Sequence, residues 1–151
     1  MAVFTTSQGR SVRHYHVGDP DWYPELSAAD VQHCRDIVAG FTSAVEVDQP
    51  TMKFNCHGFA FAEAHAFFLR PGMFEADDVF SIPFASARKG DIVSYRNASG
   101  THKHSAIVEQ VSNGKIVRLR SKWGSMATVL HDLNGVPAVY GKPKILYRRN
   151  P

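Results

Sequence analysis

Two residue types in this chain could carry covalent or acid–base chemistry: two cysteines and eight histidines. Cys56 stands in the stretch NCHGFAFA, at the expected start of a strongly apolar helix. A thiol attacks well only as a thiolate, and a histidine within reach can take its proton. The free N–H groups of a helix start lower a thiol pKa and can hold an oxyanion. The pattern therefore predicts Cys56 as a nucleophile, with Asn55 as an additional oxyanion donor.

The base is expected among the histidines of the second half of the chain. His104 opens the stretch HSAIVEQV, which alternates like a strand and would hold the ring on a rigid element. His102 lies two residues earlier, in the expected loop. His57 follows Cys56 directly, where a helix directs its side chain elsewhere. We therefore predict that His104 is the base that pairs with Cys56.

A third group should orient the imidazole. If Asn113-Gly114 form the turn of a hairpin, residues 121–123 lie beside His104 by register alone. The Ser121 hydroxyl could then accept a hydrogen bond from the imidazole N–H. His131, on the next expected strand, is a rival for this orienting role.

The elements that must position these residues follow from periodicity and turn signals. A helix is expected at 28–40, begun by a capping box at Ser27, and an apolar central helix at 56–69, ended by Pro71-Gly72. Strands are expected at 92–96, 104–111, 116–123, 126–133 and 142–149. Helices followed by antiparallel strands predict an α+β fold, a single domain over residues 1–151.

The composition and charge argue against some classes of function. The 151 residues are 44% hydrophobic and 21% charged, which is ordinary for a globular protein. The net charge is +3 and the basic residues are scattered, without the basic stripe of a nucleic-acid binder. No window approaches the roughly 18 apolar residues of a membrane span. The N-terminus lacks the pattern of a Sec signal. We expect a protein made in the cytoplasm and exported, if at all, by a non-Sec route.

The two cysteines do not form a disulfide scaffold, so both are expected to be reduced. Cys34 falls among the apolar positions of the helix at 28–40, where a cysteine acts as a small buried hydrophobe.

Four stretches together resemble one group of enzymes. They are NCHGFAFA at 55–62, KGDIVSY at 89–95, HSAIVEQV at 104–111 and SKWG at 121–124. In this order they resemble the CHAP and NlpC-like amidases and the papain-type peptidases. The resemblance implies a papain-like fold with the nucleophile at a central helix start, packed on an antiparallel sheet.

The same resemblance implies a thiol hydrolase without a cofactor. Cys56, His104 and Ser121 take the catalytic positions, although papain-type enzymes carry Asn where this chain has Ser121. Asn55, His57 and Trp123 take supporting positions. CHAP and NlpC-like enzymes often cut peptidoglycan peptides, so peptides or peptidoglycan are the implied substrates.

Two alternatives remain open from the residues. The same pair could serve a papain-like deamidase or transferase toxin acting on proteins, a bacterial effector for which an immunity or inhibitor protein is the expected partner. The chain could instead be a non-catalytic interaction module that binds zinc through a set of cysteine and histidine ligands. That set would be Cys56, His57, His102 and His104.

Overall fold

The computed structural model describes residues 4–12, 15–16, 26–51, 54–62, 66–68, 70–124 and 127–151. Its helices are α1 (Ala28–Ala39), α2 (Cys56–Phe61) and α3 (Gly72–Asp77), with the 3-10 turns η1 (Phe84–Ser86) and η2 (Ala138–Tyr140). Its strands are β1 (Tyr15–His16), β2 (Val45–Glu46), β3 (Ala66–Phe67), β4 (Val79–Ile82), β5 (Ile92–Arg96), β6 (His102–Ser112), β7 (Lys115–Lys122), β8 (Thr128–His131) and β9 (Lys142–Arg149). Helices combined with an antiparallel sheet confirm the predicted α+β class.

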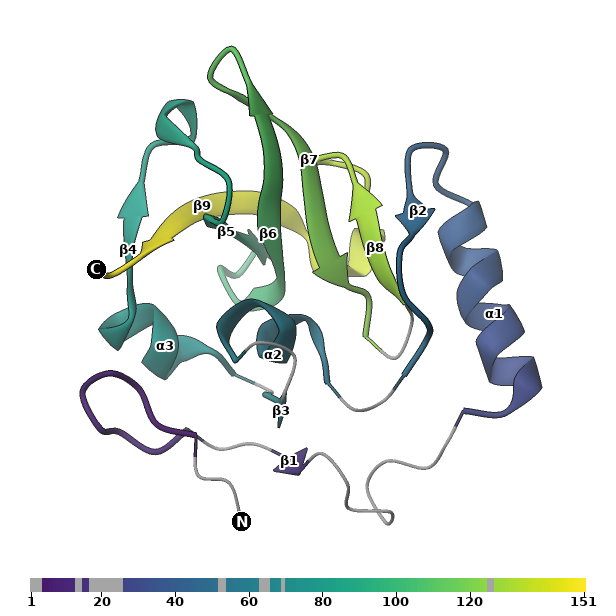
Figure 1. The fold of residues 1–151 in the computed structure, drawn as a ribbon, viewed down its shortest axis with the longest axis horizontal. Helices are drawn as coiled ribbons and strands as arrows, with labels where there is room; N and C mark the ends of the chain where they lie inside the picture. The colour runs from purple at the N-terminus through teal and green to yellow at the C-terminus, as the bar shows by residue number, and fades with distance from the viewer. Residues whose placement is uncertain are drawn as a thin grey trace.

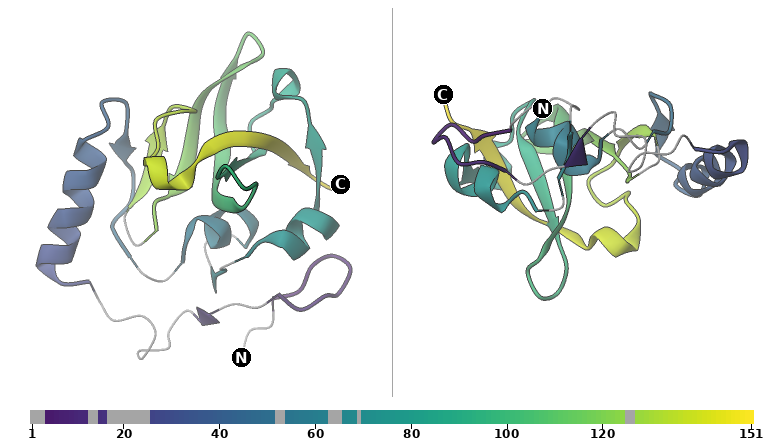
Figure 2. Two further views of the ribbon diagram at one scale, coloured as in Figure 1. Left: turned by 180° about the vertical axis from the view of Figure 1, so that it is seen from behind. Right: turned by 90° about the horizontal axis from the view of Figure 1, so that it is seen from below.

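Within the described ranges, seven strands form one antiparallel sheet in the order β2-β8-β7-β6-β5-β9-β4, and β1 pairs with β3. Helix α2 lies at the end of this sheet where β6 begins and β7 ends, away from the hairpin that joins them (Figure 1). Helix α1 stands outside the β2 edge. Figure 2 shows the bent β9 running from η2 to the β4 edge. The sheet therefore brings the start of β6, the end of β7 and the start of α2 together.

The β6–β7 hairpin forms as predicted. Asn113 and Gly114 have φ angles of 51° and 73°, as a two-residue type I′ turn requires. The register pairs Ser112 with Lys115, as expected from the turn. Strand β9 begins and ends at the predicted residues. Gly141, just before it, has φ 80°, and a Cβ there would lie 2.1 Å from the carbonyl oxygen of Arg96, so only glycine fits.

Helix α1 also forms where it was predicted. Its N-cap, Ser27, makes the expected capping box with Asp30, and Gly40 caps the C-terminal end. Cys34 is buried on the inner side of α1, and both cysteines are free thiols, as expected.

Two apolar clusters pack on the sheet, because successive residues of a strand point to opposite faces. Val93 and Tyr95 of β5 join one cluster, together with Val38 of α1. Ile92 joins the other cluster, together with Phe61 of α2. No helix in the described part of the chain has the length and apolar character needed to cross a membrane.

The predicted long helix at 56–69 is wrong. Helix α2 ends at Phe61, and Ala66–Phe67 form β3; residues 63–65 and 69 lie outside the described part of the chain. The Asn55 side chain explains why the chain returns: its Oδ1 accepts a hydrogen bond from the N–H of Phe68, and its Nδ2 donates to the Phe68 carbonyl oxygen. An apolar run by itself cannot distinguish a buried helix from a shorter helix followed by a strand.

The predicted stop at Pro71-Gly72 is instead a start. Helix α3 begins at Gly72, and β4 follows it to pair with β9. Neither element was predicted. This helix carries Glu75 into the candidate site described below.

Replacing Tyr95 with phenylalanine should lower the free energy of unfolding by about 1–2 kcal/mol. The fully buried Tyr95 donates a 2.7 Å hydrogen bond to the carbonyl oxygen of Leu133. The variant keeps the ring and loses this bond, which leaves a carbonyl without its donor. Urea denaturation monitored by circular dichroism measures the change. A midpoint equal to that of the unchanged protein would contradict this account of the bond.

Candidate active site

Cys56 is the first residue of α2, as predicted, and its side chain is 6% exposed. Because α2 has only six residues, individual backbone N–H groups affect the pKa of the Cys56 thiol more than a helix dipole does. The predicted low thiol pKa is wrong. Burial raises the pKa of Cys56 to about 11, although the backbone N–H groups of Ser105 and His57 and the charge of Lys122 act to lower it. The resting group is therefore a neutral thiol.

Asn55 caps α2 and is not an available oxyanion donor. Its Oδ1 accepts from the N–H of Gly58 at 2.9 Å, and both ends of its amide are bonded to the backbone of Phe68. Its contribution is to hold Cys56 in place by fixing the start of α2 against the returning chain.

His104 is fully buried in β6, which contacts α2, and the backbone N–H of the next residue, Ser105, acts on the Cys56 thiol. Its ring stacks on Tyr140 with centroids 4.0 Å apart and planes 8° apart. Neither ring nitrogen has a hydrogen-bond partner among the described residues. Burial holds the pKa of His104 well below its usual value. The neutral imidazole has one nitrogen with a free lone pair, which could accept a proton only against the effect of burial.

Tyr140 is a further residue near the candidate site that the sequence did not predict. Its ring covers the His104 imidazole. Burial raises the pKa of its hydroxyl, and a thiolate at Cys56 would raise it further. Tyr140 is therefore near both Cys56 and His104.

A β-bulge separates His102 from His104. Tyr95 pairs with His104 while Arg96 pairs with His102, so Lys103 is an extra residue in β6. Without a bulge, residues two apart share a face of a strand. The bulge breaks this rule: the His104 ring lies against Tyr95, whereas the His102 ring reaches Ser105.

The predicted bond from Ser121 to His104 is absent, because Ser121 serves another histidine. Its hydroxyl lies 2.7 Å from Nε2 of His131 and accepts from the Trp123 indole at 3.0 Å. His131 Nδ1 donates to the carbonyl oxygen of Asp132 at 2.8 Å. Both nitrogens of His131 are therefore engaged, and His131 does not orient His104 by a hydrogen bond either. These three predicted residues form a buried network of their own.

Lys122 is fully buried near Cys56, which the sequence did not predict. Its ammonium donates to the carbonyl oxygens of Thr51 and Gly124, at 2.7 and 2.5 Å. Burial lowers the pKa of Lys122 to about 8, against the opposing effect of Cys34 and Cys56. A positive charge at this place stabilises a thiolate at Cys56 as it forms.

A second group of polar residues lies beside the start of α2, around a cavity of about 640 Å³. Ser105 Oγ lies 2.8 Å from His57 Nδ1 and 2.8 Å from His102 Nε2. His102 Nδ1 is bonded to Glu75 of α3. Burial alone would raise the pKa of Glu75, but His102 and Arg96 lower it to about 2. Glu75 and Ser105 had no signal in the sequence, because nothing there predicted α3 or the bulge.

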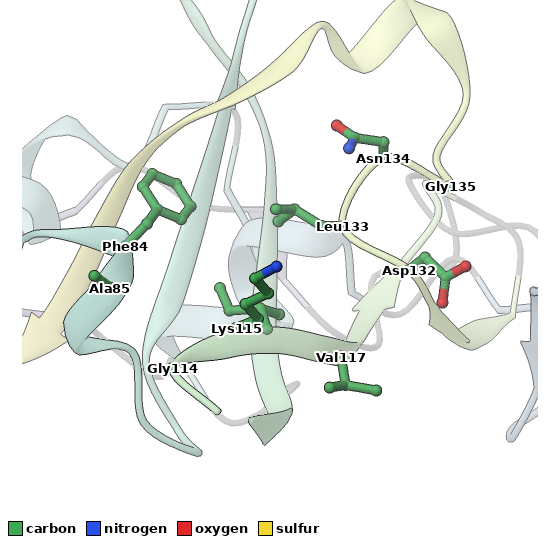
Figure 3. A pocket seen from close by; sticks show the side chains of 10 residues that line it. Phe84, Ala85, Gly114, Lys115, Val117, Asp132, Leu133, Asn134 and Gly135 are labelled. Atoms are coloured by element: carbon green, nitrogen blue, oxygen red, sulfur yellow. The ribbon is translucent and has the colours of Figure 1, made fainter. Parts of the chain in front are cut away.

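Another cavity, of about 630 Å³, lies at the opposite end of the hairpin (Figure 3). Phe84, Leu133 and the stem of Lys115 give it mostly apolar walls. It contains none of the predicted catalytic residues.

The zinc alternative has no support in the described part of the chain, where no three His, Cys, Asp or Glu side chains are arranged to hold a metal ion. Of the four predicted ligands, His57 and His102 do meet, with ring centroids 4.9 Å apart. Their nitrogens are bonded to Ser105 and Glu75 instead.

The buried histidines predict a loss of stability in mild acid. Burial lowers the pKa of His131 to about 4, whereas an unfolded histidine titrates near ~6.5. Because the folded value is the lower one, the unfolded chain binds more protons below pH ~6.5, and the free energy of unfolding falls as the pH drops from about 6.5 toward 4. His131 would account for up to about 3 kcal/mol of this loss.

Urea unfolding at several pH values between about 6.5 and 4.5 tests this dependence. His131→Gln should flatten the decline, whereas His33→Gln, at an exposed position of α1, should leave it unchanged. Parallel declines in all three proteins would contradict the assignment to His131.

Comparison of the chain with protein-family models, with curated proteins and with solved structures finds no match.

Proposed function

We propose that this chain is a cysteine-dependent amidohydrolase or peptidase with a papain-like arrangement, in which Cys56 is the nucleophile and His104 its base. One observation carries the proposal: Cys56 begins α2, which contacts β6, and the backbone N–H of Ser105 acts on its thiol, while the preceding residue, His104, is buried with both ring nitrogens unpartnered among the described residues. A buried imidazole without partners costs stability, which makes a functional role the better explanation.

The reaction starts from a neutral thiol and a neutral imidazole. As Sγ of Cys56 attacks the amide carbonyl carbon, its proton passes to a ring nitrogen of His104. The carbonyl oxygen becomes an oxyanion, for which the backbone N–H groups of His57 and Ser105 near the sulfur are the available donors. The ammonium of Lys122 favours the thiolate character that develops on sulfur.

The intermediate then collapses to a thioester. The amine leaves with the proton held by the His104 imidazolium, and neutral His104 next takes a proton from the water that attacks the thioester. This returns the Cys56 thiol and releases the carboxylic acid. Tyr140, stacked on the imidazole, keeps water away from its face and fixes the ring plane.

Peptidoglycan peptides are the proposed substrate class, because the four motifs resemble those of CHAP and NlpC-like amidases. Incubation with purified muropeptides, followed by mass spectrometry, separates the reactions open to this pair. Cleavage into two peptides supports the amidase. Loss of a side-chain amide without cleavage would instead support a deamidase, and an unchanged mixture would contradict the substrate class. The Cys56→Ala protein is the control for a contaminating activity.

A further inference from the structure

The hydrogen-bonded chain Glu75–His102–Ser105–His57 fixes where its protons lie. His102 Nε2 is 3.0 Å from the carbonyl oxygen of His104, and a carbonyl only accepts, so Nε2 carries a proton. His102 Nδ1 is bonded to the carboxylate of Glu75, whose pKa His102 and Arg96 lower to about 2.

The proton on Nε2 of His102 determines the next two links. Ser105 cannot donate to a protonated nitrogen, so its O–H is directed to Nδ1 of His57, 2.8 Å away. His57 then carries its own proton on Nε2, and burial, which lowers its pKa to about 3, keeps it neutral. The order Ser105–His102–Glu75 is that of a serine hydrolase triad, but Nε2 of His102 is directed to the His104 carbonyl oxygen and is not free to take the Ser105 proton.

The cavity beside these hydrogen-bonded side chains has an excess of positive charge. Arg70 and Lys103 are exposed at its rim, and Arg96 lines it from β5. Its one lining carboxylate, Glu75, is already bonded to Arg96 and His102. The Nε of Arg96 is buried and has no acceptor among the described residues. The cavity thus offers donors and cationic groups that no described anion balances.

We propose that this cavity binds the carboxylate of a ligand, with Nε2–H of His57 as the donor at its floor and Arg70 and Lys103 at its rim. The cavity adjoins α2 at His57, the residue after Cys56, although Cys56 itself does not line it. The substrate class is then an amide that carries a carboxylate near the bond to be cut. This substrate class rests on the proposed function, whereas the binding of the anion does not.

Binding is best measured in the Cys56→Ala protein, which cannot turn a substrate over. Glutarate is the probe, glutaramide its neutral analogue and inorganic phosphate the competing oxyanion. Titration followed by NMR of the imidazole ¹⁵N resonances should show saturable shifts of His57 and His102 with glutarate. Absence of such shifts, or equal binding of glutaramide, would overturn the proposal. Tighter binding of phosphate would overturn the assignment to a carboxylate.

Variants identify the cavity as the place of binding. Arg70→Gln and Lys103→Gln should each weaken glutarate roughly two- to fivefold, since exposed charges contribute modestly. Lys115→Gln is the matched control, because this lysine lines the other cavity (Figure 3). His57→Gln should weaken binding about tenfold or more. Ser105→Ala, a milder change, should weaken it by freeing the His57 proton to occupy either nitrogen.

Affinity that is unchanged in both Arg70→Gln and Lys103→Gln, or reduced equally by Lys115→Gln, would contradict the site. Anion binding without any acyl transfer by the unchanged protein would contradict the proposed function and support the anion site. Acyl transfer without anion binding would contradict the anion site and support the proposed function.

Discussion

Cys56→Ala should reduce turnover of an activated acyl ester, such as N-acetylglycine p-nitrophenyl ester, to the background rate, a loss of roughly 10³-fold or more. The sulfur forms the bond to the acyl group, so no neighbouring group can replace it. His104→Ala should cause a loss of similar order, because the neutral Cys56 thiol, with its pKa raised to about 11, needs a base when it attacks. Release of nitrophenolate, followed by absorbance, measures both rates.

Cys34→Ala is the matched control. Cys34 is the other buried free thiol, and it lies in α1. Its replacement should leave turnover close to that of the unchanged protein. If Cys34→Ala lost activity while Cys56→Ala stayed active, the nucleophile would be Cys34, which would contradict the proposal.

Asn55→Ala should lower the free energy of unfolding by about 3 kcal/mol or more. The change removes the N-cap of α2, which contributes about 1 kcal/mol. It also leaves the buried N–H and carbonyl groups of Phe68 without partners, at about 1–3 kcal/mol for each unsatisfied group. Urea denaturation gives the value, with the m-value as a check on two-state behaviour.

Asn97→Ala provides the comparison, because the Asn97 amide also accepts from a backbone N–H, that of Thr101, but in an exposed turn. That variant should lose less than about 1 kcal/mol. Asn55→Asp, which keeps the acceptor and loses the donor, should fall between the two. Equal losses at positions 55 and 97 would contradict the role of Asn55 as the clamp between α2 and the segment at 66–68.

The elements that local chemistry specifies were predictable. The Asn113-Gly114 turn fixes the β6–β7 hairpin, since both φ angles must be positive, and the register of the hairpin follows from the turn. Helix α1 was predictable because Ser27 and Asp30 form its capping box. The placement of Cys56 at a helix start followed from its position before an apolar run.

The errors arise where tertiary contacts override local patterns. The end of α2 depends on a bond between Asn55 and Phe68, thirteen residues apart, which no periodicity reports. The partner of Ser121 depends on β8: Ser121 pairs with Val129, which places His131 on the diagonal within reach. The hairpin register alone predicts His104 as the neighbour of Ser121 and carries no information on β8.

The bulge at Lys103 had the largest consequence for the candidate site. A strict alternation would put His102 and His104 on one face, and the choice between them as base would then be open. The bulge instead gives each a separate role, His104 against Tyr140 and His102 in the chain to Glu75. Bulges change register without a distinctive residue, so the sequence alone did not predict this division.

The account depends on an acyl group passing through the Cys56 sulfur. Intact-mass spectrometry of the protein, quenched in acid soon after mixing with N-acetylglycine p-nitrophenyl ester, tests that step directly. We predict one acyl group per chain, mapped by peptide analysis to Cys56, absent from Cys56→Ala and formed far more slowly in His104→Ala. An unmodified protein, an acyl group on Cys34, or acylation of Cys56 at an unchanged rate in His104→Ala would contradict the account.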